Sequence, residues 1–149
     1  LFASNMNRLP QWQQMLFGEL SVKWELLLLQ VVQGQQIGRS IGFPTANIQV
    51  EDPYKLLPRD GAYAVFAEVN GLRYKAMLNI GDRPTVAGGQ KTIEAHLIDF
   101  QGDLYGQVLT IYFEAFLREE KKFASLEALK TQLVEDRERA IFSLQTQMK

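Results

Sequence analysis

Hydrophobic and polar residues alternate along much of the chain, which is the pattern of β-strands with one buried face. The alternation is clearest over residues 63–69 and again over 74–80. Asn70-Gly71 lies between these two runs and supplies the positive φ angles that a tight type I′ turn needs. The sequence therefore predicts a β-hairpin at this position.

Further runs predict more strands. Residues 22–32 read as a buried strand, and 46–50 as a short extended segment. A second hairpin is predicted between 93–100 and 108–117, with Gln101-Gly102-Asp103 at its turn. Asp99 and Asp103 are interpreted as turn-forming residues. We expect these strands to pair antiparallel.

After Phe123 the hydrophobic period becomes helical. Ser125 is a good N-cap, and an apolar stripe follows it. The stripe consists of Leu126, Leu129, Leu133, Ala140, Ile141 and Leu144. Many antiparallel strands followed by one long helix favour a closed or nearly closed barrel, with the helix laid against it, over a parallel doubly wound sheet. We expect residues 1–20 to form an atypical N-terminal segment with a short helix, and 21–149 to form the one main domain.

The composition excludes several classes of site and partner. The 149 residues include no Cys and one His, which excludes disulfides, thiolate metal sites and multi-histidine metal centres. The net charge of −1 speaks against nucleic acid as a partner. The longest apolar stretch is far short of the ~20 residues of a membrane-spanning helix, and no signal peptide pattern begins the chain. We therefore expect a cytoplasmic protein with neither a membrane nor a nucleic-acid partner.

A glycine-rich segment carries the first candidate chemistry. Gly34, Gly38 and Gly42 recur at four-residue spacing, and glycines let backbone N–H groups approach a phosphate closely. Arg39 adds a charged fork for phosphate oxygens. Thr45 and Asn47 then lie two apart on an extended segment, so both oxygens face the same side and suit Mg²⁺. A glycine-rich loop with a polar strand edge is the alternative interpretation.

The string Gly-Arg-x-x-Gly-Phe-Pro-Thr-Ala-Asn at 38–47 resembles the signature of the riboflavin kinase family, including the kinase module of bacterial bifunctional FAD synthetases. Further motifs of that family follow in the same order. They lie at 60–65, 77–85, 92–96, 103–106 and 117–126.

The resemblance implies a mainly β fold, a six-stranded antiparallel Greek-key barrel with a long C-terminal helix across its opening. It implies that 21–149 is a kinase domain that transfers the γ-phosphate of ATP to the ribityl 5′-hydroxyl of riboflavin, giving FMN and ADP. ATP and riboflavin are then the substrates, with Mg²⁺ or another divalent ion as cofactor. It leaves open an FMN adenylyltransferase domain upstream in the native chain.

The resemblance also assigns roles position by position. Glu94 matches the catalytic base, and Thr45 and Asn47 match the pair that binds the metal and the nucleotide. The loop over the nucleotide phosphates contains Gly34, Gly38 and Arg39, and the segment that closes on the flavin contains Arg118, Glu120 and Phe123.

Two other functions remain open at this point: a non-catalytic barrel that binds a flavin or nucleotide, and an adaptor for nucleic acid or protein. His96 shares a strand face with Glu94. We favour a hydrogen-bonded structural His96 over a second acid–base group.

Overall fold

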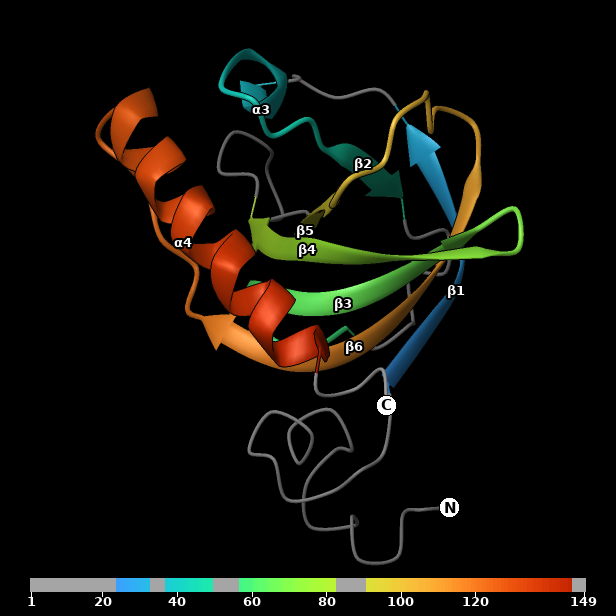
Figure 1. Ribbon diagram of the computed structural model, residues 1–149. Helices are drawn as coiled ribbons and strands as arrows, with labels where there is room; N and C mark the ends of the chain where they lie inside the picture. Colours follow the sequence, from blue (N-terminus) through green and yellow to red (C-terminus); the bar gives the residue numbers. More distant parts are fainter. Residues whose placement is uncertain (1–23, 33–36, 50–56, 83–90, 146–149) are drawn as a thin grey trace, which may run out of the picture.

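Six strands and one long helix account for most of the described chain (Figure 1). The computed structural model describes residues 24–32, 37–49, 57–82 and 91–145, so the predicted N-terminal segment 1–20 and Gly34 lie outside it. The elements in chain order are β1 (Trp24–Val32), the helical turn α3 (Ile37–Ser40), β2 (Ala46–Gln49), β3 (Gly61–Val69), β4 (Leu72–Asp82), β5 (Lys91–Leu97), β6 (Val108–Arg118) and α4 (Leu126–Gln145).

All strand pairs are antiparallel, and the strands neighbour one another in the order β1-β2-β5-β4-β3-β6. A ladder between β1 and β6 joins the two ends of this order into a closed barrel, with a register shift between Leu26 and Leu29. The prediction of six antiparallel strands with a C-terminal helix is confirmed. No helix in the described ranges is long and apolar enough to cross a membrane.

The first predicted hairpin is confirmed. β3 and β4 pair from Gly61 with Ile80 to Val69 with Leu72. Both turn residues have positive φ, 53° at Asn70 and 79° at Gly71, as a type I′ turn requires. Asparagine and glycine tolerate this conformation better than other residues, so the turn chemistry fixed the register of this pair.

The second predicted hairpin is wrong. β5 pairs with β2 on one edge and β4 on the other, whereas β6 pairs with β1 and β3. Residues 98–107 instead carry the chain past β2 and β1, and the backbone of Val31 exchanges hydrogen bonds with Gly106 and Gln107. Hydrophobic alternation indicated which residues face the core, but it carries no information about which strand lies alongside.

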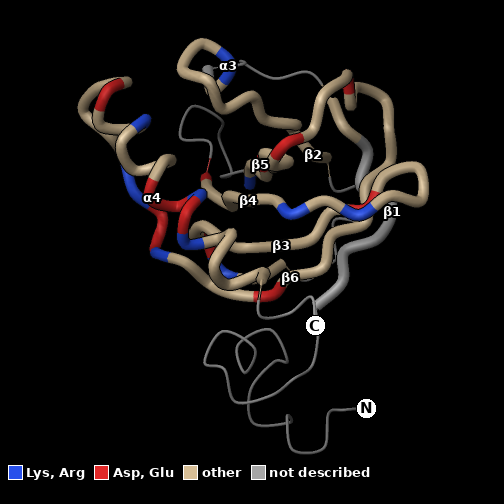
Figure 2. Tube along the Cα trace, in the orientation of Figure 1, with Lys and Arg blue, Asp and Glu red and all other residues tan. Residues whose placement is uncertain are grey.

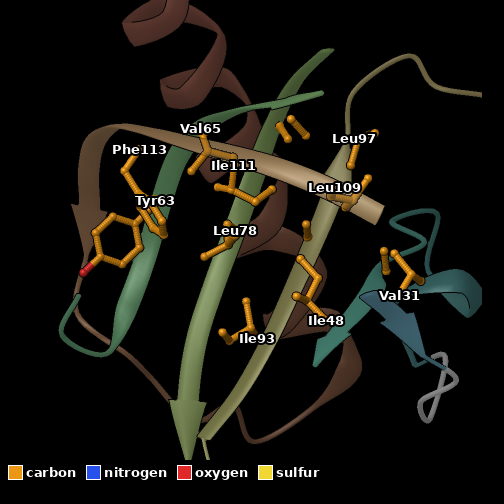
Figure 3. Packing of buried hydrophobic residues seen from close by; sticks show 14 of the residues in the cluster. Val31, Ile48, Tyr63, Val65, Leu78, Ile93, Leu97, Leu109, Ile111 and Phe113 are labelled. Atoms are coloured by element: carbon orange, nitrogen blue, oxygen red, sulfur yellow. The ribbon is translucent and has the colours of Figure 1, made fainter. Parts of the chain in front are cut away.

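The barrel interior is filled by the inward-facing side chains of all six strands (Figure 3). β3 is buried on both faces: Tyr63 and Val65 point into the barrel, and Ala62, Ala64 and Phe66 pack under α4. The helix therefore lies on the outer wall formed by β3, β4 and β6, and the expectation that it crosses the opening is not met.

The apolar stripe of α4 also differs from its prediction. Ala140 and Leu144 are fully buried as expected, but Leu126 is 51% exposed and Asp136 is buried. Asp136 accepts hydrogen bonds from Arg118 Nε and Nη2 at 2.8–3.0 Å and from Gln132 Nε2 at 2.9 Å. This ion pair ties the helix to the end of β6. The N-cap prediction is confirmed, because Ser125 Oγ accepts a hydrogen bond from the Ala128 N–H.

The Arg118–Asp136 pair yields a stability prediction. Asp136→Ala leaves the Arg118 guanidinium, whose side chain is only 14% exposed, without its countercharge. Because an uncompensated buried charge is costly, we expect the free energy of unfolding in urea to fall by about 3 kcal/mol.

Two variants serve as controls. Glu138→Ala, at an exposed position of the same helix, should change the free energy of unfolding by less than about 0.5 kcal/mol. The double variant Arg118→Met/Asp136→Leu removes both charges and should lose less than Asp136→Ala alone. A double variant as unstable as the single one contradicts the ion-pair explanation.

Candidate active site

A cavity of about 420 Å³ opens at one end of the barrel, where β1, β2 and β5 meet the 98–107 connection. Its polar lining includes Arg39, Thr45, Asn47 and Asp103. Its other lining residues are Val31, Val32, Pro44, Ala46, Ala95, Leu97, Phe100, Gly102, Leu104 and Tyr105. A concave site of this size, with apolar walls and a few convergent polar groups, is typical of small-molecule binding.

The glycine-rich segment forms a tight turn beside this cavity. Residues predicted as loop contain the helical turn α3, and directly after it the N–H groups of Ile41 and Gly42 donate to the carbonyls of Gly38 and Arg39. The Phe43 N–H also donates to the Gly38 carbonyl, at 2.7 Å. A Cβ at residue 38 would lie 2.1 Å from the Phe43 carbonyl oxygen, so only glycine fits this turn. Gly38 therefore shapes the segment that places Arg39 at the cavity.

Glu94, which the sequence assigned to the same site as Thr45 and Asn47, lies next to both of them. The Thr45 hydroxyl donates a hydrogen bond of 2.9 Å to Glu94 Oε1. Asn47 on β2 and Asn79 on β4 are the direct cross-strand partners of Glu94 on β5. Since Ile93 and Ala95 point into the core, these three polar residues form a row on the outer face of the sheet.

Glu120 reaches the same row from the segment after β6. Asn79 Nδ2 donates to Glu120 Oε2 at 3.4 Å. The carboxylate lies directly over Gly81, where a Cβ would come within 2.0 Å of Glu120 Oε2. Asn79 thus links Glu120 to the strand position beside Glu94. The sequence analysis did not single out Asn79, because a polar residue at an outward strand position reads as ordinary surface.

Arg118 and Phe123 lie together, away from the cavity lining. The Arg118 guanidinium is 5.7 Å from the centre of the Phe123 ring and is held by Asp136. Lys121 Nζ is 5.6 Å from the same ring. The predicted residues therefore fall into two groups. Arg39, Thr45 and Asn47 line the cavity, with Glu94 bonded to Thr45, and Arg118 and Phe123 lie between the end of β6 and the start of α4.

His96 is hydrogen-bonded, as expected. Its Nδ1 lies 2.7 Å from the Pro44 carbonyl oxygen, and its ring centre lies 5.3 Å from that of Phe43. Because a carbonyl only accepts, the proton is assigned to Nδ1. Burial lowers the pKa of His96 from its ordinary value, so the ring is neutral near pH 7.

The sequence analysis did not predict that residues 98–107 form a wall of the cavity. The turn-forming roles of Asp99 and Asp103 are confirmed, since Asp99 has a φ of 59° and Asp103 Oδ1 accepts a hydrogen bond from the Tyr105 N–H. The same turn carries Phe100, Leu104 and Tyr105 to the cavity. The aromatic and apolar character of these residues could have indicated a binding wall. The predicted tight hairpin instead assigned them to paired strands and a turn.

The cavity has few charged groups with which to hold a metal. Among the described residues, no group of three or more His, Cys, Asp or Glu side chains is suitably placed for an ion. Thr45, directly before β2, and Asn47, within β2, line the cavity and carry a hydroxyl and an amide oxygen. Such a donor pair fits Mg²⁺, which commonly takes few protein ligands and completes its shell with waters and substrate phosphates.

Residues 27–144 match the family model described as riboflavin kinase, or flavokinase. The bifunctional riboflavin kinase/FMN adenylyltransferase of Pseudomonas fluorescens is 47% identical over 108 residues, which cover 72% of this chain and 34% of that protein. The RNA-binding riboflavin kinase RibR of Bacillus subtilis is 42% identical over 107 residues, covering 71% of this chain and 45% of that one. This chain thus spans less than half the length of each of these two relatives.

Solved structures give the same fold. A crystal structure described as a macrolide-efflux protein from Streptococcus pneumoniae has a TM-score of 0.73 at 32% identity and covers 85% of this chain and 43% of that one. The crystal structure of riboflavin kinase from Trypanosoma brucei has a TM-score of 0.55 at 28% identity, covering 84% and 82%. With the family model matching most of its length, the chain belongs to the riboflavin kinase family.

Proposed function

We propose that this chain is an ATP-dependent riboflavin kinase that gives FMN and ADP, with the Greek-key barrel of that family. The observation that carries the proposal is the hydrogen bond between Thr45 and Glu94, because it holds the assigned metal-binding residue beside the assigned base at the edge of the cavity. Phosphoryl transfer depends mainly on such positioning and on charge neutralisation.

The cavity supports binding of the nucleotide. Leu97, Phe100 and Leu104 offer an apolar wall for the base, and Arg39 with the turn at Gly38 offers charge and close backbone approach for the phosphates. Gly34 is assigned to the same loop but lies outside the described residues. Thr45 and Asn47 would hold Mg²⁺, which would neutralise phosphate charge when bound.

Glu94 is assigned as the general base. The ribityl 5′-oxygen attacks the γ-phosphorus, its proton passes to the Glu94 carboxylate, and the bond from the γ-phosphorus to the bridging oxygen breaks to release ADP. The hydrogen bond from Thr45 fixes the carboxylate in place. Glu120, Arg118 and Phe123 are assigned to the flavin, whose ribityl chain then runs along the row of Asn79 and Glu94.

Two partner assignments belong to this proposal. By analogy with the bifunctional relatives, we assign the native polypeptide an FMN adenylyltransferase domain, which would use the FMN that the kinase makes. The absence of a nucleic-acid partner stays a prediction, since one relative is described as RNA-binding. In its favour, acidic and basic residues are interleaved along α4, which presents no continuous basic stripe (Figure 2).

The decisive experiment incubates the protein with ATP, Mg²⁺ and riboflavin and separates the flavins by chromatography. We expect FMN to accumulate with one ADP per FMN. Flavin binding without FMN formation, under several divalent metals, would instead favour the non-catalytic binding barrel.

The first variant tests the base. Glu94→Gln keeps the size and hydrogen bonding of the side chain but cannot accept a proton, so kcat should fall by roughly 10²–10⁴-fold. The KM values for ATP and riboflavin should change by less than about tenfold. Glu135→Gln, at an exposed position of α4, is the matched control. Full activity of Glu94→Gln would place the base elsewhere.

The second variant tests the metal-binding pair. Thr45→Val keeps the shape of the side chain but removes its oxygen, so nucleotide affinity and kcat at limiting Mg²⁺ should each fall by about tenfold or more. Riboflavin binding without nucleotide, followed by fluorescence quenching, should change little. Thr131→Val on α4 is the control. Unchanged kinetics at limiting Mg²⁺ would reject the assignment.

A further inference from the structure

The segment between the glycine turn and β2 is held by a side chain from β5. Residues 43–45 lie outside the regular strands, and Pro44 has no N–H, so its carbonyl is its one backbone group for hydrogen bonding. That carbonyl lies 2.7 Å from His96 Nδ1. With the proton on Nδ1, the imidazole donates to Pro44 and thereby fixes the backbone directly before Thr45.

His96 also contacts the residue that closes the glycine turn. Its ring packs at a tilt of 59° against Phe43, which is buried. The Phe43 N–H is in turn bonded to the Gly38 carbonyl. One imidazole therefore contacts the side chain of Phe43, which closes the glycine turn, and the backbone carbonyl of Pro44 directly before Thr45.

The position of His96 on β5 makes these contacts relevant to catalysis. His96 and Glu94 are two residues apart on one strand, so they share a face at a fixed spacing. Thr45 contacts Glu94, and its neighbour Pro44 contacts His96. The two hydrogen bonds thus fasten the same short segment to the same strand at two points.

We infer that His96 is a positioning residue for phosphoryl transfer. Its hydrogen bond to the Pro44 carbonyl keeps Arg39 and the Thr45–Asn47 pair in register with Glu94. His96 acts through the backbone of Pro44, to which it donates its Nδ1–H, and Glu94 stays the group assigned to take the substrate proton. This inference rests on the proposed kinase function.

The test separates the ring from the hydrogen-bond donor. His96→Phe keeps a ring against Phe43 but removes the donor, whereas His96→Asn loses the ring but places an amide N–H near the position of Nδ1. We expect kcat/KM for ATP to fall about 10- to 100-fold in His96→Phe, through both KM and kcat, since small misplacements of catalytic groups cost rates of this order. His96→Asn should recover most of that loss.

Binding measurements and a control complete the design. Calorimetric titration with ADP and Mg²⁺ should show weaker binding in His96→Phe than in His96→Asn, while riboflavin affinity without nucleotide should match the wild type. Thr92→Val removes another side-chain hydrogen bond from β5 to backbone, that to the Gly81 carbonyl, and should leave the KM for ATP unchanged. His96→Gln, whose amide lies one bond further out, provides a second donor-displaced variant if His96→Phe does not fold, and should lose activity in the same way.

Three results would overturn the inference. They are wild-type kcat/KM in His96→Phe or His96→Gln, equal losses in the Phe and Asn variants, and a loss confined to thermal stability. Failure of the proposed function is separate, because it would appear as absence of FMN formation by the wild-type protein.

Discussion

The rest of the structure depends on the pairing of β5 with two partners, β2 on one edge and β4 on the other. This arrangement places Asn47, Glu94 and Asn79 side by side across three strands. It also prevents β5 from pairing with β6, so the chain must cross β2 and β1 before β6 begins. That crossing segment becomes a wall of the cavity, so one pairing constraint creates both the polar row and the pocket beside it.

Strand alternation places the polar row and the packed core on opposite faces of the sheet. Ile93 and Ala95 fill the barrel interior, while Glu94 between them faces outward to the polar row. A carboxylate on the inner face would face the large cost of burying an unpaired charge. Because the two faces are separate, the polar row can carry hydrogen bonds and the half-buried Glu94 carboxylate without interrupting the packed core.

The long helix packs on the same outer face of the barrel, over β3, β4 and β6. It packs on the outer face of β3, where small residues such as Ala62 and Ala64 lie, so both faces of β3 are buried. Its single buried carboxylate, Asp136, binds Arg118 at the point where β6 ends. The segment assigned to the flavin starts at this anchor, and Glu120 then extends from it to Asn79. The docking of the helix and the placement of this segment therefore depend on one ion pair.

Local chemistry in the sequence determined much of this protein. The Asn70-Gly71 turn, the Ser125 cap and the alternation of β3 and β4 are short-range signals, and each predicted its element correctly. The motif string at 38–47 assigned Arg39, Thr45 and Asn47 to nucleotide and metal binding; the structure places all three in the lining of one cavity, and their roles stay predictions. The tertiary structure alone decided the neighbours of β5, the place of Asp136 under the helix and the role of 98–107 as a wall. These features depend on contacts between residues far apart in the chain, and periodicity specifies which face a residue takes but not what covers it.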